Sequence, residues 1–96
     1  MSNMKKIKIY IVDDHAIVRD GLKYILAAEE KFEVAGDCGD GRIALDEVDK
    51  LNPDVVILDI SMPDITGLET ARQIRRYNKT VKIIILSRHN NGEYVR

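Results

Sequence analysis

Short aliphatic runs alternate with amphipathic segments along these 96 residues, and this alternation restricts the fold more than any other feature. Four short runs are candidate strands; they are "IKIYIV", "FEVAG", "DVVILDI" and "VKIIILS", at residues 7–12, 32–36, 54–60 and 81–87, and all but the second are rich in β-branched residues. Each of the first three is followed by a segment with apolar residues at helical spacing. Strands and helices that alternate in this way form right-handed crossovers and a parallel sheet. The sequence therefore predicts an α/β fold.

The three expected helices carry recognisable start and stop signals. The first is expected over residues 16–29, and Asp40 is placed to cap the second, which Pro53 would stop. Thr66 and Glu69 have the spacing of a capping box and would open the third helix. The inner face of this third helix would carry Leu68, Ala71 and Ile74.

The fourth strand raises the question of what covers it. Like the third strand, it is apolar on both sides of its pleat, so we expect both strands to be buried on two faces. A fourth helix would begin at Asn90 or Asn91, about one turn before the sequence ends at Arg96. A long apolar edge would then face water and favour pairing with another chain. We expect either a fragment or a homodimer, formed by self-association or strand exchange through this edge.

Composition excludes several classes of function. Fifteen basic and sixteen acidic residues nearly cancel, whereas phosphate recognition in nucleic acids needs a basic face. One cysteine, Cys38, excludes an internal disulfide and a cysteine-built zinc site, and we expect it to be a small, partly buried residue. No signal peptide or membrane-spanning run is present, so we expect a cytoplasmic protein that contacts no membrane.

Three aspartates stand at strand ends. Asp13 and Asp14 follow the first strand, and Asp59 ends the third. In the flavodoxin-like order 2-1-3-4-5, strands one and three are neighbours at the point where the strand order reverses, and ligands bind there. We therefore expect the three carboxylates to converge in one shallow pocket.

A hard divalent cation would relieve the repulsion between these three anions. Mg²⁺ takes oxygen ligands, commonly one or two carboxylates together with waters and phosphate oxygens. A carboxylate in such a pocket can also attack phosphorus and become an aspartyl phosphate. The alternative is that the aspartates only cap the helices that follow, which fits Asp14 best and Asp59 worst. His15 is expected to be a polar residue at a helix start, with proton transfer as the alternative. Ser87 is expected to be a strand-end or capping serine, and the alternative is that its hydroxyl donates to a phosphoryl oxygen.

Taken jointly, these motifs resemble the receiver domain of bacterial two-component response regulators, with a CheY-like form of the flavodoxin-like fold. The matching segments are "IVDDH", "LDISMPDITGLE" and "IILSRH". The runs "DDHAIVRDGLKYIL" and "VAGDCGDGRIAL" look most like the NarL/LuxR-type subgroup. The resemblance covers nearly the whole chain and implies a receiver domain over residues 5–96.

The resemblance also implies roles for individual residues. Asp59 would accept a phosphoryl group from a histidine kinase, and Ser87 would be the hydroxyl that closes on that group. Mg²⁺ would be held by Asp13, Asp14 and Asp59 together with the backbone carbonyl of Ser61. Receiver domains also have a fifth strand, a fifth helix and a lysine after that strand, and we expect this chain to lack all three. A DNA-binding output domain, which would regulate transcription, is likewise expected outside this sequence.

Two other functions are weighed against the receiver. A phosphohydrolase with an aspartyl nucleophile, similar to haloacid dehalogenases, needs a second aspartate two residues after the nucleophile as its acid and base. Ser61 stands there and cannot do this, so we do not expect an enzyme beyond phosphorylation of Asp59 itself. The third reading is an interaction domain that never takes up phosphate.

Overall fold

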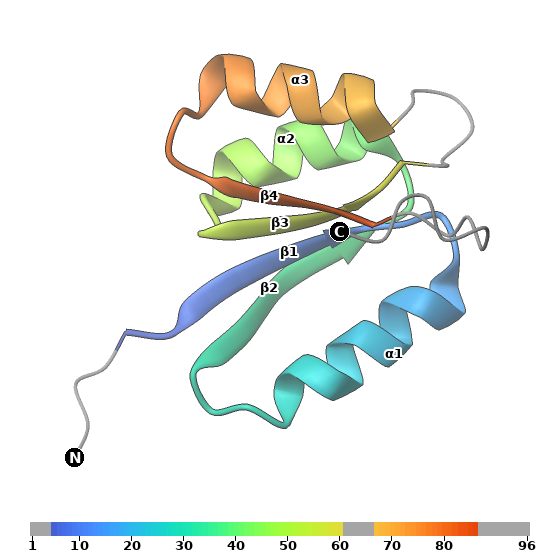
Figure 1. Ribbon diagram of the computed structural model, residues 1–96, viewed down its shortest axis with the longest axis vertical. Helices are drawn as coiled ribbons and strands as arrows, with labels where there is room; N and C mark the ends of the chain where they lie inside the picture. The colour runs from blue at the N-terminus through green and yellow to red at the C-terminus, as the bar shows by residue number, and fades with distance from the viewer. Residues whose placement is uncertain (1–4, 61–66, 87–96) are drawn as a thin grey trace.

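The computed structural model describes residues 5–60 and 67–86. Strands and helices alternate through this part of the chain, as the sequence predicts (Figure 1). The elements are β1 (Ile7–Val12), α1 (Ala16–Ala27), β2 (Phe32–Cys38), α2 (Gly41–Leu51), β3 (Val55–Asp59), α3 (Gly67–Tyr77) and β4 (Lys82–Leu86).

The described strands form one parallel sheet in the order β2-β1-β3-β4. The chain runs from β1 to β2 on one side and then returns to place β3 on the other side of β1. Figure 1 shows α1 on one face of the sheet and α2 with α3 on the opposite face. The predicted flavodoxin-like arrangement is confirmed for these four strands, and the reversal of strand order falls between β1 and β3.

Alternating side chains of the central strands supply two separate cores. Tyr10 and Val12 of β1 point toward α2 and α3, where they pack with Val56 and Leu58 of β3, among others. Neighbouring residues point the other way; those buried beneath α1 are Ile9, Ile11 and Ile57. Both faces of β3 are buried in this way, which explains why its first four residues form a continuous apolar run.

Helix ends follow the capping chemistry expected from the sequence. Asp40 is the N-cap of α2, and its carboxylate accepts a hydrogen bond from the backbone N–H of Arg42 at 2.7 Å. Asn52 ends that helix in a left-handed conformation, with φ of 50°, directly before Pro53. The first helix ends at Ala27, two residues earlier than predicted, and β2 continues two residues further, to Cys38.

Two expectations about burial are wrong. Leu68 was expected on the inner face of α3 but is 58% exposed, whereas Ala71 and Ile74 do face the core. Burial of β4 on both faces is also wrong, since Ile84 is 50% exposed and Ile85 is 40% exposed. Among the described strands β4 pairs only with β3, so its other edge has no strand partner in residues 5–60 and 67–86. No helix in residues 5–60 or 67–86 has the length and apolarity to cross a membrane.

Candidate metal centre

Strand register places two of the predicted aspartates side by side. In the parallel pairing of β1 with β3, Val12 lies opposite Leu58. The next residue after Val12 is Asp13, and the next after Leu58 is Asp59, so the two aspartates follow the same residue pair of the sheet. Neighbouring strands are about 4.8 Å apart, and alternate residues point to the same face. The two carboxylates therefore share one edge of the sheet, on the side that α1 covers.

Four potential ligand atoms meet at this edge. Asp13, Asp14, His15 and Asp59 each offer one, and all four atoms lie within 4.8 Å of one another. Asp13 is 1% exposed and Asp59 is fully buried, whereas the side chain of Asp14 is 27% exposed. The expected convergence of the three aspartates is therefore observed, and the set also includes His15, which was expected to be only a polar residue at a helix start.

The two oxygens of Asp13 have different surroundings. Its Oδ1 accepts a hydrogen bond from the backbone N–H of His15 at 2.8 Å, which forms a tight turn after β1. Its Oδ2 is buried and has no hydrogen-bond partner in the described part of the chain. Burial of a carboxylate oxygen without a hydrogen-bond partner lowers the stability of the folded protein. A bound cation would remove that cost, so this oxygen supports a metal site.

Helix capping does not explain Asp14. The N-cap position of α1 is occupied by His15, whose side chain makes no capping hydrogen bond. The carboxylate of Asp14 instead lies 2.8 Å from Nδ1 of His15, and the same nitrogen is 3.1 Å from Oδ1 of Asp13. The imidazole thus faces both acids.

Arg19 supports the acidic loop, a role that was not predicted from the sequence. Its Nη1 donates to the backbone carbonyl of Asp13 at 2.6 Å, and its Nε donates to Asp37 at the end of β2 at 2.8 Å. Lys23 contacts the other oxygen of Asp37 at 3.2 Å. Arg19 lies one helical turn after His15, and this spacing was the only feature of the sequence that could have indicated a contact with the acidic loop. The guanidinium ties the β1–α1 turn to the neighbouring strand.

Gly67 allows α3 to begin close to the nucleophile candidate. A Cβ atom at this position would overlap the backbone carbonyl of Asp59 and the Cα of Ile60. Only glycine permits this approach. Two other predicted site residues, Ser61 and Ser87, lie outside the described residues, and so do Thr66 of the proposed capping box and the expected fourth helix.

The donor set fits a hard divalent ion. Three carboxylates provide the oxygen ligands that Mg²⁺ prefers, and the partly exposed Asp14 leaves one side open to water.

Cys38 does not belong to this site. It is buried, and its thiol contacts the backbone oxygen of Asp40 at 3.3 Å. Its expected role as a small structural residue fits that contact.

Tyr10 anchors the opposite face of β1. Its hydroxyl donates to Glu47 of α2 at 2.8 Å, and its ring lies against Gly36, where a β-bulge shifts the pairing of β1 with β2. Burial raises the pKa of the Tyr10 phenol above its usual value, and hydrogen bonds to Cys38 and Glu47 raise it further. This network holds α2 on the sheet and does not belong to the acidic site.

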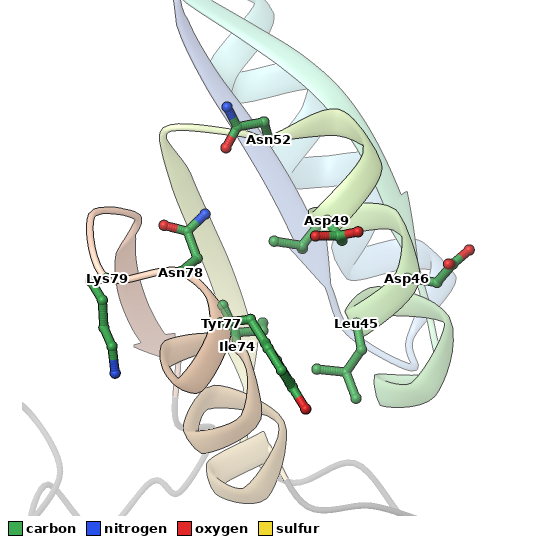
Figure 2. Close-up of a pocket in the computed structure, with 9 residues that line it drawn as sticks. Leu45, Asp46, Asp49, Asn52, Ile74, Tyr77, Asn78 and Lys79 are labelled. Carbon is green, nitrogen blue, oxygen red and sulfur yellow. The ribbon is translucent and has the colours of Figure 1, made fainter.

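A separate cavity of about 610 Å³ lies between α2 and α3 (Figure 2). Its walls include Asp49 on α2 and Ile74 and Tyr77 on α3, followed by Lys79. These residues belong to the C-terminal parts of the two helices, and the four acidic-site residues do not line it. The candidate metal centre at the strand ends is therefore distinct from this hollow.

Comparison with known proteins gives a consistent result. The model of the response regulator receiver domain family matches residues 9–96. The transcriptional regulatory protein DegU of Brevibacillus brevis is 45% identical over 97% of this chain and 39% of its own length. The nitrate/nitrite response regulator protein NarL of Escherichia coli is 32% identical over 99% of this chain and 44% of its own.

A solved structure shares the fold. The RcsB response regulator of Salmonella typhimurium, described for its DNA interaction, superposes with a TM-score of 0.83 and 32% identity. The match covers 92% of this chain and 46% of that one. The chain thus spans less than half the length of each of these three proteins.

Proposed function

This chain belongs to the response regulator receiver domain family, with relatives of the NarL/LuxR type, and on that premise we propose that Asp59 accepts a phosphoryl group from a histidine kinase. The observation that carries the proposal is the meeting of Asp13, Asp14 and Asp59 within 4.8 Å at the strand ends. Acids so close together at a reversal of strand order are suited to phosphoryl transfer.

In the proposed reaction, a carboxylate oxygen of Asp59 attacks the phosphorus of a phosphohistidine. The new O–P bond forms as the P–N bond breaks, and the imidazole of the kinase leaves with a proton from solvent. Ser87 is proposed as the hydroxyl that hydrogen-bonds the transferred group.

Mg²⁺ is the proposed cofactor. Asp13, Asp14 and Asp59 would hold it, with the backbone carbonyl of Ser61 as a further ligand. When bound, the ion would neutralise the charge of the phosphoryl oxygens during transfer. The buried, unpartnered oxygen of Asp13 supports this choice because it lacks any other counterpart among the described residues.

We also propose a wider setting for the domain. Residues 5–96 would form the receiver domain of a longer transcription regulator, with a C-terminal DNA-binding domain outside this chain. The names of DegU and NarL as regulators, and the DNA interaction of RcsB, support this output. The proposal places the protein in the cytoplasm, with a histidine kinase as partner.

The other functions have less support. The matched family is not a family of enzymes, so an aspartyl phosphohydrolase is not favoured. Ser61 also lacks the acid and base chemistry that turnover on external esters requires. An interaction domain without phosphorylation would not account for the burial of Asp13 and Asp59 beside Asp14 at the strand ends.

Intact mass spectrometry tests the proposed function. The protein is incubated with Mg²⁺ and acetyl phosphate, and in parallel with beryllofluoride while amide chemical shifts are followed. We expect one added phosphoryl group, which is lost in Asp59→Asn and kept in Asp49→Asn, an exposed acid on α2. A modification that persists in Asp59→Asn would exclude this role, and so would the absence of any response to both reagents.

A further inference from the structure

The histidine beside the acids has the geometry of a fourth ligand. Nδ1 of His15 lies 2.8 Å from Oδ1 of Asp14 and 3.1 Å from Oδ1 of Asp13. The side chain is 50% exposed, so it borders the site on its open side. The backbone N–H of His15 donates a hydrogen bond to Oδ1 of Asp13, and this bond fixes the position of the His15 backbone beside the acids.

We propose that His15 gives this centre a nitrogen donor, so that the site binds borderline divalent ions such as Ni²⁺, Co²⁺ and Zn²⁺ more tightly than Mg²⁺. The inference shares the three acids with the proposed function but concerns which metal they accept. His15 is then the residue that determines metal selectivity.

Ligand chemistry separates the two kinds of ion. Mg²⁺ favours oxygen ligands and retains waters, so an imidazole contributes little to its binding. Imidazole nitrogen suits nickel, copper and zinc, and affinity for a mixed nitrogen and oxygen site rises from manganese to copper. A site of three carboxylates and one imidazole therefore discriminates between Mg²⁺ and Ni²⁺ through its nitrogen.

The positions of the donor atoms agree with one shared ion. The four ligand atoms already lie within 4.8 Å of one another, and metal–ligand bonds of about 2.0–2.2 Å place two ligands on opposite sides of an ion little more than 4 Å apart. The ring nitrogen that now contacts both carboxylates would turn to the ion. The buried Oδ2 of Asp13, which lacks a partner among the described residues, offers a further donor.

The competing explanation is that His15 only hydrogen-bonds the two aspartates. His15 would then orient the aspartate oxygens in the same way whichever metal ion is bound. Loss of the ring would change the affinities for Mg²⁺ and Ni²⁺ by the same factor, or change neither. The ratio of the two affinities is therefore the informative quantity.

Calorimetric titration of tag-free protein with Mg²⁺ and with Ni²⁺ measures this ratio. In His15→Gln we expect Ni²⁺ affinity to fall by at least about tenfold, the loss typical when support of a metal site is removed. Mg²⁺ affinity should change less than about twofold, because oxygen ligands remain. His89→Gln is the matched control, since it removes the only other histidine, and we expect it to leave both affinities unchanged.

A second measurement needs no variant. Zn²⁺ should shift the ¹⁵N resonances of the His15 ring, whereas Mg²⁺ should shift the neighbouring amides but not the ring. An unchanged Ni²⁺ affinity in His15→Gln, or equal losses for both ions, would overturn the inference. These results leave the proposed function intact, which fails instead if Asp59→Asn is still phosphorylated.

Discussion

At the scale of single residues, the site depends on a small number of side chains that hold acids in place. Asp13 and Asp59 are buried at the edge where β1 and β3 both end. Arg19 neutralises Asp37 and binds the carbonyl of Asp13, so it fixes the turn without contacting a candidate ligand oxygen. We expect this support to affect metal binding as well as stability.

Arg19→Gln should therefore lower the Mg²⁺ affinity severalfold and destabilise the protein by about 1–2 kcal/mol, the usual cost of losing a hydrogen-bonded charge. Unfolding in urea and calorimetric titration give the two quantities. Lys23→Gln is the control, because Lys23 contacts the same Asp37 carboxylate and not the carbonyl of Asp13. If both variants bind Mg²⁺ like the wild type, Arg19 has no role in positioning the loop.

At the scale of elements, β4 is the strand whose surroundings differ most from expectation. Ile84 pairs in register with Ile57, yet Ile57 is buried under α1 and Ile84 is half exposed. Within residues 5–60 and 67–86, no second strand lies beside β4. An apolar edge strand of this kind favours self-association through its backbone groups and its side chains.

We expect the 96-residue protein to form larger species as its concentration rises, and Ile84→Lys to shift it toward the monomer. A charge on the edge strand opposes pairing between copies. Light scattering over a concentration series is the measurement. Ile17→Lys serves as a control for general surface hydrophobicity, because Ile17 is 84% exposed on α1 and lies off the strand edge. A monomer at all concentrations would contradict this expectation.

The contact between Tyr10 of β1 and Glu47 of α2 leads to a prediction about how stability depends on pH. The raised pKa of buried Tyr10 means that stability from this group is complete below about pH 10, its value in the unfolded chain. Above that pH the unfolded phenol ionises first, so the free energy of unfolding falls by up to about 1.4 kcal/mol per pH unit. Urea unfolding between pH 9 and 11 should show a shallower decline in Tyr10→Phe. Equal slopes would mean that the phenol is not the cause.

At the scale of the whole molecule, most of the fold could be predicted from the sequence patterns typical of strands and helices. The order of elements, the parallel sheet and the meeting of the three aspartates were all predictable, because period-two burial and strand-end position follow from the sequence. The roles of Arg19 and His15 were not, because they depend on how the turn after β1 folds back toward β2. Leu68 and β4 were misjudged because apolar character does not reveal which neighbours are present.

The central claim is that acids from distant parts of the chain share one ion. A Mg²⁺ titration of wild type, Asp13→Asn, Asp59→Asn and the double variant tests it most directly. We predict that each single substitution removes most of the affinity and that the double variant loses little more, while Asp49→Asn binds normally. Mg²⁺ affinity unchanged in both single variants would contradict the account.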